Sequence, residues 1–239
     1  MAEVSSSPRE FIEKIESEPE VVRRAFRGYV HRFNVGKDVV ALLTLVGRSW
    51  KTYGSLGAHF LKYLEPEHTD IGPALDALIA EWRSWNREKS ESFGYFLTAP
   101  RDGSCCKRWC MFLRWVGRAD DGLDLGLWSG SAGGAAYRKT FRGKTLRTEQ
   151  LVIPLDTHTG RISQYIGLTR RKSLGWLAAV EVTDSLRACD PKDPTKYDFA
   201  LARLGILDLC QKKYRAEICQ KCDLLSVCQF AISKSKALV

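Results

Sequence analysis

Four of the eight cysteines lie close together near the C-terminal end of the 239-residue chain. They are Cys210, Cys219, Cys222 and Cys228, with the spacing C-x8-C-x2-C-x5-C. Four thiolates so near in sequence can bind one soft metal centre, either an iron–sulfur cluster or a zinc ion. Zinc sites usually use two close cysteine pairs, and only Cys219 and Cys222 form one. The spacing predicts a metal centre and leaves both metals open, with four unrelated buried thiols as the remaining alternative.

A candidate functional carboxylate is that of Asp156, which follows the apolar segment 151–155 and precedes a predicted helix. From the residues alone, the simplest interpretation is that Asp156 caps this helix, since aspartate is common at helix starts. The remaining cysteines, outside the tail, are expected to be small apolar core residues. They are Cys105, Cys106, Cys110 and Cys189.

The charge of the chain indicates a polyanionic partner. Its net charge is +9 and its pI is about 9.2, a balance that favours binding to phosphates through counterion release. Basic residues at Arg161, Arg170, Arg171 and Lys172 have no carboxylate between them. This run suits a surface that contacts phosphates, or else a solvated face. No apolar run is long enough for a bilayer, and the N-terminal residues lack a signal-peptide layout. We therefore expect a cytoplasmic protein with no membrane partner.

Helical signals run along most of the chain. A capping box with proline predicts a helix start at residues 7–10, and Asp38 is expected to cap a helix that contains the apolar stretch 39–46. The side chains of Leu75, Leu78, Ile79 and Trp82 share one face of another predicted helix. A further helix is predicted over 107–118.

Irregular segments separate the later helices. Residues 120–150 hold a glycine-rich run and then five basic residues, which indicates a mobile phosphate-contacting loop or a solvated linker. Helical spacing resumes after Thr159 and extends to Leu186. It ends at 190–194, where Asp193 is expected to cap the next helix. We find no internal repeat and no convincing hairpin, so we predict an all-α fold.

The segment Leu155-Asp156-Thr157-His158, followed by Arg161 and Ile162, resembles the V-D-T-H-x-x-R-V motif of helix-hairpin-helix DNA glycosylases of the endonuclease III type. Upstream, the segment Gly103-Ser104-Cys105-Cys106-Lys107-Arg108 is similar to the P-G-V-G-x-K hairpin of that family and places Lys107 on its catalytic lysine. The cysteine tail resembles the family's C-x6-C-x2-C-x5-C iron–sulfur motif, with two more residues in its first spacing. A closer likeness, carried by segments 106–108, 113–128, 154–158 and 190–201, is to an uncharacterised bacterial branch of this superfamily, a domain of unknown function.

The resemblance implies a two-lobed helical fold with a C-terminal iron–sulfur loop. One lobe would comprise about 30–175 and contain the hairpin and the catalytic aspartate. The other would join 1–29 to 176–239 and carry the loop. It further implies a monomer that binds double-stranded DNA with a damaged or modified base, nucleoid-associated if bacterial, and holds a [4Fe-4S] cluster on the four tail cysteines, with zinc as the alternative.

The site implied by the resemblance has Asp156 and Lys107 as catalytic residues, with His158 and Arg108 beside them. Asp156 would stabilise positive charge that builds on the sugar as the base leaves. Lys107 could attack C1′ when neutral, which a nearby cation such as Arg108 favours; a phosphate contact or a solvated surface position is its alternative. DNA contacts are expected from the hairpin and from the basic run, at Gly103, Ser104, Arg161, Arg170, Arg171 and Lys172.

Two departures from the family pattern accompany the resemblance. Cys105 stands where the hairpin has its second glycine, and the separation of Lys107 from Asp156 is longer than in endonuclease III. Three functions therefore remain open. The first is a DNA glycosylase, with or without lyase activity. The others are a non-catalytic binder of modified or distorted DNA, and an enzyme that processes hypermodified bases while they stay attached to DNA.

Overall fold

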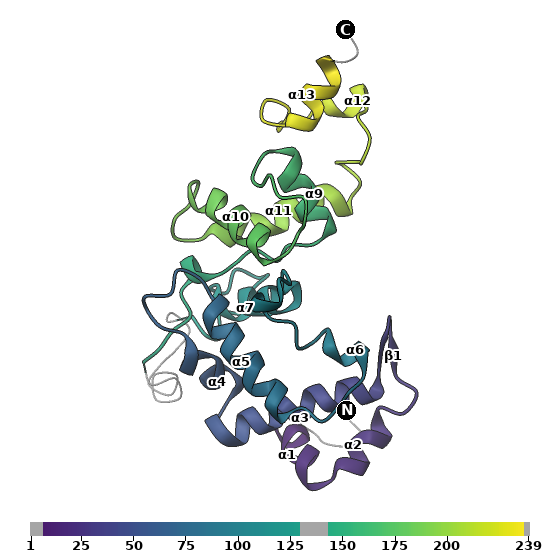
Figure 1. The fold of residues 1–239 in the computed structure, drawn as a ribbon, viewed down its shortest axis with the longest axis vertical. Helices are drawn as coiled ribbons and strands as arrows, with labels where there is room; N and C mark the ends of the chain where they lie inside the picture. The colour runs from purple at the N-terminus through teal and green to yellow at the C-terminus, as the bar shows by residue number, and fades with distance from the viewer. Residues whose placement is uncertain (1–6, 130–142, 237–239) are drawn as a thin grey trace. The chain divides into compact units, whose positions relative to one another are not determined.

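The computed structural model describes residues 7–129 and 143–236, and these are predominantly helical (Figure 1). The chain divides into two compact units. Unit 1 comprises Met1–His68, Gly72–Asp102 and Gly133–Thr145, and unit 2 comprises Thr69–Ile71, Gly103–Ala132 and Leu146–Val239. In the described ranges, no helix combines the length and apolar character needed to cross a bilayer.

Unit 1 contains five helices of seven residues or more in its described part. The elements are α1 (Pro8–Ser17), α2 (Pro19–Ala25), β1 (Val30–His31), β2 (Asn34–Val35), α3 (Gly36–Tyr53), α4 (Leu56–Tyr63), α5 (Gly72–Trp85), α6 (Glu91–Gly94) and the 3₁₀ helix η1 (Pro100–Asp102). The predicted start of the first helix is confirmed, since Ser7 Oγ accepts a hydrogen bond from the Glu10 amide at 3.1 Å. The predicted apolar face of α5 is confirmed too, because Leu75, Leu78, Ile79 and Trp82 are all buried.

The start of α3 differs from the prediction. The helix begins at Gly36, so Asp38 is its third residue and not its N-cap. The Asp38 side chain reaches back and accepts a hydrogen bond from the Val35 amide at 2.9 Å. Glycine is required at position 36, because a Cβ there would lie 2.0 Å from the Phe26 carbonyl oxygen. That close packing of backbone on backbone fixes the helix start three residues earlier than the capping signal indicates.

A short hairpin corrects the expectation of a purely helical chain. Strands β1 and β2 pair antiparallel, with Val30 opposite Val35 and His31 opposite Asn34. The turn places Arg32 at a φ of 57°, and it lacks the Asn-Gly pair that usually signals a two-residue hairpin. The Asn34 side chain instead anchors the hairpin, since its amide donates to the Ser92 carbonyl at 2.9 Å.

A buried polar cluster joins three helices of unit 1. Glu81 on α5 accepts hydrogen bonds from the hydroxyls of Tyr53 and Tyr63, the former at 2.7 Å. His59 Nε2 lies 3.0 Å from Glu81 Oε2, and His59 Nδ1 lies 2.9 Å from Ser49 Oγ. Burial alone would raise the pKa of Glu81, but these hydrogen bonds outweigh it and lower the pKa to about 2. Glu81 therefore holds α3, α4 and α5 together as a carboxylate.

Unit 2 is also helical in its described part. Its elements are α7 (Lys107–Gly117), η2 (Thr148–Gln150), α9 (Thr157–Tyr165), α10 (Trp176–Arg187), η3 (Pro194–Tyr197), α11 (Asp198–Ile206), α12 (Ala216–Cys219) and α13 (Gln229–Lys236). The predicted helix over 107–118 is confirmed by α7, with Trp109, Leu113 and Val116 buried. The predicted helical stretch from 159 to 186 is two helices, because the chain turns at Gly167, where φ is +78°.

The predicted cap at Asp193 needs correction, and the predicted loop over 120–150 lies partly outside the described residues. Asp193 does not cap η3 with its side chain. Its carboxylate instead accepts hydrogen bonds from the Arg118 guanidinium, at 2.9–3.2 Å. Of the segment expected to be a mobile loop or linker, residues 130–142 lie outside the described part. Residues before it fold back on α7, where the Trp128 amide donates to the Val116 carbonyl at 2.6 Å.

The first two helices belong to unit 1. Helices α1 and α2 lie with α3 in that unit. The reason is that α1 and α2 pack on α3, where Phe11, Ile15 and Val22 form a buried apolar cluster. Periodicity identifies the apolar face of each helix but does not specify the face of another helix against which it packs.

Candidate catalytic site and cysteine pocket

Lys107 and Asp156 lie together in unit 2. The Lys107 Nζ donates to Asp156 Oδ2 at 3.2 Å. Lys107 is the first residue of α7, and Asp156 is the N-cap of α9, where its Oδ1 accepts from the amides of His158 and Thr159 at 2.8 and 2.7 Å. Asp156 is therefore both a helix cap and an ion-pair partner, with one carboxylate oxygen for each role.

The electrostatics of the pair keep Asp156 ionised. Its burial would by itself raise the pKa, but the amide of Thr159 and the ammonium of Lys107 outweigh this, and the pKa of Asp156 lies below its usual value. The Asp156 side chain is 20% exposed and that of Lys107 is 41% exposed. A negative charge that is held in place and still reachable can stabilise a developing cation on a bound molecule.

The turn before Lys107 has a strained backbone. Gly103 has a φ of +76°, and Cys106 has a φ of +47°, a conformation that is uncommon for a residue with a Cβ. The Gly103 carbonyl accepts from the Trp176 amide at 3.1 Å, so the turn is fixed to the start of α10. Ser104 Oγ accepts from the Cys106 amide at 3.2 Å. Of the two expected DNA contacts here, the Ser104 hydroxyl is already used within the turn.

Cys105 connects this turn to the segment that carries Asp156. Its Sγ donates to the Leu155 carbonyl at 3.3 Å. Cys106 and Cys110 are buried as expected, whereas Cys105 is half-buried and Cys189 is exposed. The expectation of a core position is therefore wrong for Cys189, because it follows the last turn of α10 where the chain leaves the helix.

The structure also contains a buried ionic network on α7 that was not among the site residues predicted from the sequence. Arg114 on α7 donates to Asp198 Oδ2 at 2.9 Å and to Asp124 Oδ2 at 3.2 Å. Burial raises the pKa of Asp198 to about 6, although Arg114 opposes this shift, and the nearby charge of Asp156 raises it further. The signal was present in the sequence, since Arg114 lies four residues after Cys110 and so falls on the same buried side of α7.

The two residues expected beside the candidate catalytic pair differ in their positions. His158 packs against α11, where a Cβ on Gly205 would lie 2.6 Å from the ring. Its Nδ1 is buried with no hydrogen-bond partner among the described residues. Arg108 is exposed. The geometry gives His158 a role in packing α9 on α11.

Some side chains of the basic run that was expected to bind phosphates already have partners within the protein. Arg161 donates to the Cys210 carbonyl at 3.0 Å. Arg171 forms an ion pair with Glu181 at 2.8 Å, and the Arg170 amide also donates to Glu181 at 3.3 Å. The basic run itself contains no acidic residue, but Glu181 on α10 lies beside it and pairs with Arg171. Lys172 is exposed, and together with Arg171 and Gly103 it lines a hollow at the start of α10.

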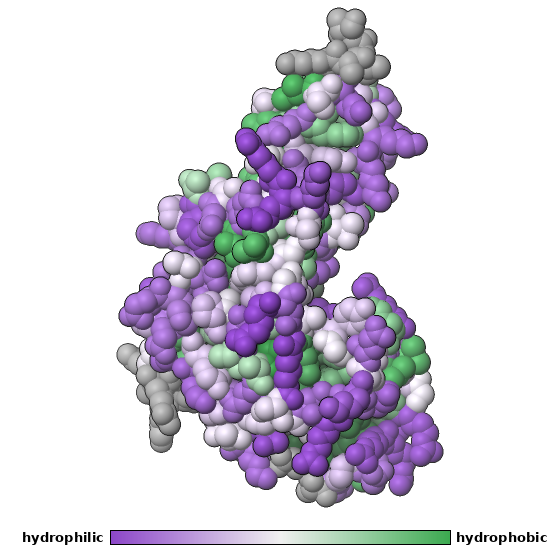
Figure 2. Space-filling model, in the orientation of Figure 1, coloured by the Kyte–Doolittle hydropathy of each residue, from purple (hydrophilic) through white to green (hydrophobic). Residues whose placement is uncertain are grey.

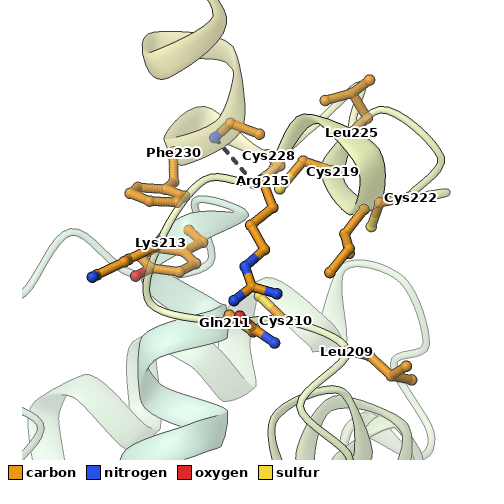
Figure 3. A pocket seen from close by; sticks show the side chains of 13 residues that line it. Leu209, Cys210, Gln211, Lys213, Arg215, Cys219, Cys222, Leu225, Cys228 and Phe230 are labelled. Carbon is orange, nitrogen blue, oxygen red and sulfur yellow. Dashed lines mark hydrogen bonds between the residues drawn. The ribbon is translucent and has the colours of Figure 1, made fainter.

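All four tail cysteines line one pocket (Figure 3). The ring of Tyr165 on α9 and the ring of Phe230 on α13 stack beside it, with centroids 4.3 Å apart. Figure 3 shows the side chain of Arg215 running among the cysteines. Burial raises the pKa of the Cys210 thiol, and the positive charge of Arg161 opposes the shift.

The pocket fits a four-thiolate centre by the number and type of its donors. Within the described ranges, no group of three or more cysteine, histidine or acidic side chains is placed to hold a metal ion. A single zinc ion requires four sulfurs at about 2.3 Å from one point. The donor set is thus brought to one cavity without converging on such a point.

Comparison with known proteins identifies a family. The model of the family described as "Protein of unknown function (DUF2400)" matches residues 1–207, and the chain belongs to this family. The match ends before Cys210, so it includes Lys107, Asp156 and Asp198 but not the cysteine pocket. No curated protein and no solved structure matches the chain.

Proposed function

We propose that this protein is a DNA glycosylase with a helix-hairpin-helix fold, which excises a damaged or modified base from double-stranded DNA. The observation that carries the proposal is the 3.2 Å contact between Lys107 Nζ and Asp156 Oδ2, which brings together residues 49 positions apart. These are the two residues to which the resemblance assigns catalysis. The strained turn that starts at Gly103 and leads into α7 supports the same assignment.

Asp156 would act on the sugar. Cleavage of the N-glycosidic bond leaves the electron pair on the departing base and positive charge at C1′. A carboxylate near C1′ stabilises that charge without forming a bond. Asp156 suits the role, because its Oδ1 is fixed by two amides of α9 while its Oδ2 faces Lys107.

Lys107 would either orient Asp156 or act as a nucleophile. For the second role its ammonium must first give up a proton, and Asp156 Oδ2 is a hydrogen-bonded acceptor at 3.2 Å. In that role Asp156 serves as the base and does not also supply the negative charge that stabilises C1′. The neutral amine then attacks C1′, the bond from C1′ to the base breaks, and the base leaves with the bonding electrons and takes up a proton. Opening of the sugar gives a Schiff base, which borohydride reduces to a stable adduct.

The cofactor we propose is a [4Fe-4S] cluster bound by Cys210, Cys219, Cys222 and Cys228, with zinc as the alternative. A cluster held by four cysteines has no open position for substrate, so its contribution would be to fold the loop around it. Arg215 lies among the thiols and would compensate their negative charge. Tyr165 and Phe230 would shield the centre from solvent on one side.

The test is a panel of duplexes that each contain one modified base, assayed with protein in excess and analysed by mass spectrometry. We expect free base from at least one duplex, and loss of that product in Asp156→Asn with binding retained. Borohydride should trap an adduct that Lys107→Ala loses and that the exposed Lys192→Ala control retains. Binding by the wild-type protein without any free base would contradict the proposal and favour the binder, and a changed base still attached to DNA would favour base processing.

The metal is tested by spectrum and by analysis. Protein purified without oxygen should show a broad absorbance band near 400 nm and about four irons per chain. Cys222→Ser should lose the band, whereas Cys189→Ser should retain it, because Cys189 lies outside the pocket. A colourless protein that contains zinc would contradict the cluster and leave the four-thiolate site.

A further inference from the structure

Unit 1 carries a basic hollow that the glycosylase site does not use. Two adjoining cavities follow α2 and the first part of α3, and both are lined by Arg23, Lys37 and Val40. Their volumes are about 470 and 550 Å³, each within the range for small-molecule pockets. The hollow, named here by its helices as the α2–α3 hollow, is therefore larger than a single small anion requires.

The charge of this hollow is strongly positive. Six basic and two acidic side chains line it, which gives a balance of four positive charges. Each acid is paired with one base, Glu20 with Arg23 and Glu88 with Lys37. The remaining bases form no ion pair with a carboxylate in the described part of the chain. They are Arg24, Arg27, Arg48 and Arg87.

Two of the basic residues are separated along one helix. Lys37 and Arg48 both belong to α3, and at a rise of 1.5 Å per residue their separation along the helix axis is about 16 Å. Arg48 lies over the ring of Trp85, with its Cζ 4.6 Å from the centroid. Such stacking fixes the plane of the guanidinium, whose forked donors match the oxygens of a phosphate. A separation of this length fits several successive phosphates of one strand and not one phosphate alone.

Aromatic residues adjoin the basic residues. Tyr29 and Val30 line the hollow at the base of the β1–β2 hairpin and are 43% and 66% exposed. On the same hairpin Phe33 is 49% exposed, and its ring lies 4.9 Å from that of Tyr95. In Figure 2, hydrophobic and hydrophilic surface lie side by side where this hairpin is drawn in Figure 1. Exposed aromatic rings beside arginines are typical of surfaces on which unpaired bases stack.

We propose that the α2–α3 hollow binds the phosphate backbone of DNA, with the hairpin beside it able to stack on an unpaired base. The inference deepens the proposed function, because it names a second contact surface for the same substrate. An acidic peptide would also be attracted by the charge. The exposed aromatic rings and the separation of the basic residues favour the nucleic acid.

The test compares two charge-matched variants of the full chain. Arg24→Gln with Arg27→Gln removes two positive charges from the hollow, whereas Arg9→Gln with Lys89→Gln removes two exposed charges from outside it. Binding to an undamaged fluorescent duplex and to one of its strands is measured by anisotropy over a series of salt concentrations. The hollow variant should bind at least about tenfold more weakly at low salt, with a salt slope for the duplex reduced by about two. The control variant should match the wild-type protein.

Other outcomes separate this inference from the glycosylase proposal. Equal slopes for the two variants, or no DNA binding by the wild-type protein, would overturn the inference, as would equal competition by polyglutamate and by DNA of matched charge. If the hollow variant shows a reduced salt slope of DNA binding but the wild-type protein releases no base, the result would support DNA binding by the α2–α3 hollow and contradict the glycosylase proposal. If the double variant fails to fold, Arg87→Gln in the loop after α5 tests one charge of the same hollow, with an expected reduction of about one in the slope.

Discussion

Arg161 donates a hydrogen bond from Nη2 to the carbonyl oxygen of Cys210 at 3.0 Å. The helix that begins after Asp156 is thus hydrogen-bonded, one turn further on, to the first of the four cysteines that line the pocket. Tyr165, at the end of the same helix, stacks on Phe230 at the other side of that pocket. Helix α9 therefore contacts both the candidate catalytic carboxylate and the candidate metal centre.

This link predicts that Arg161→Gln weakens metal retention. The variant loses a charge-assisted hydrogen bond that positions Cys210, and residues around a metal site commonly change affinity by about tenfold or more when altered. Metal release to a chelator should be about tenfold faster than in the wild-type protein. Arg203→Gln, which removes an exposed charge from α11, is the control and should release metal at the wild-type rate. Identical release from both variants would show that Arg161 does not support the site.

Substitutions at Asp156 should separate its two roles. Asparagine remains a good N-cap, so Asp156→Asn should lower the free energy of unfolding by less than about 1 kcal/mol, whereas Asp156→Ala should cost about 1–2 kcal/mol. Both variants lose the carboxylate, so both should lose base excision by about a hundredfold or more. Chemical denaturation and single-turnover kinetics provide the two readouts. Full excision by Asp156→Asn would mean that the residue is only a cap.

Asp198 predicts a pH dependence of stability. Its pKa of about 6 in the folded protein lies above the ordinary 3.8, so the folded state retains this proton to higher pH than the unfolded state does. The contribution of Asp198 to the free energy of unfolding should therefore fall by about 3 kcal/mol as pH rises from below 4 to above 6. Denaturation at pH 4, 5, 6 and 7 measures the slope. Asp198→Asn should flatten it, and an unchanged slope would assign the proton to another group.

Glu81 predicts the opposite dependence in unit 1. Its pKa is lowered from 4.5 to about 2, so its stabilising effect is complete above pH 4.5 and is lost as pH falls through 2. Glu81→Gln should lower the free energy of unfolding by about 3 kcal/mol at pH 7, because the side chain is only 21% exposed. The deficit relative to wild type should shrink towards pH 2. The exposed Glu67→Gln control should show no such deficit at either pH.

Much of the local structure could be predicted from the sequence. The start of α1, the buried face of α5 and the extent of α7 follow from capping residues and helical spacing, which are local signals. The pairing of Lys107 with Asp156 came from the family resemblance. Spacing alone gives no distance between residues 49 positions apart.

Long-range packing accounts for what could not be predicted. The start of α3 depends on how closely Gly36 approaches the Phe26 carbonyl, and the capping role expected of Asp193 is lost to its ion pair with Arg118. The acid that neutralises Arg171 comes from Glu181 on the next helix. In each case the partner lies on another element, beyond the neighbouring helical turns that capping and periodicity describe.

Lys144 bears on how the chain folds as it is synthesised. Its Nζ donates to the carbonyls of Lys62 and Leu64 at 3.3 and 3.1 Å and pairs with Glu65 at 2.9 Å. The carbonyls at the C-terminal end of α4 therefore gain this hydrogen-bond donor only when Lys144, about eighty residues later in the chain, has been synthesised. Domains generally fold from the N-terminus as they emerge, but unit 1 becomes complete only after much of the first part of unit 2, including α7, has left the ribosome. Segments of the two units therefore alternate in the order in which they are synthesised. A nascent chain that stalls before residue 144 would lack the Lys144 hydrogen bonds at the C-terminal end of α4.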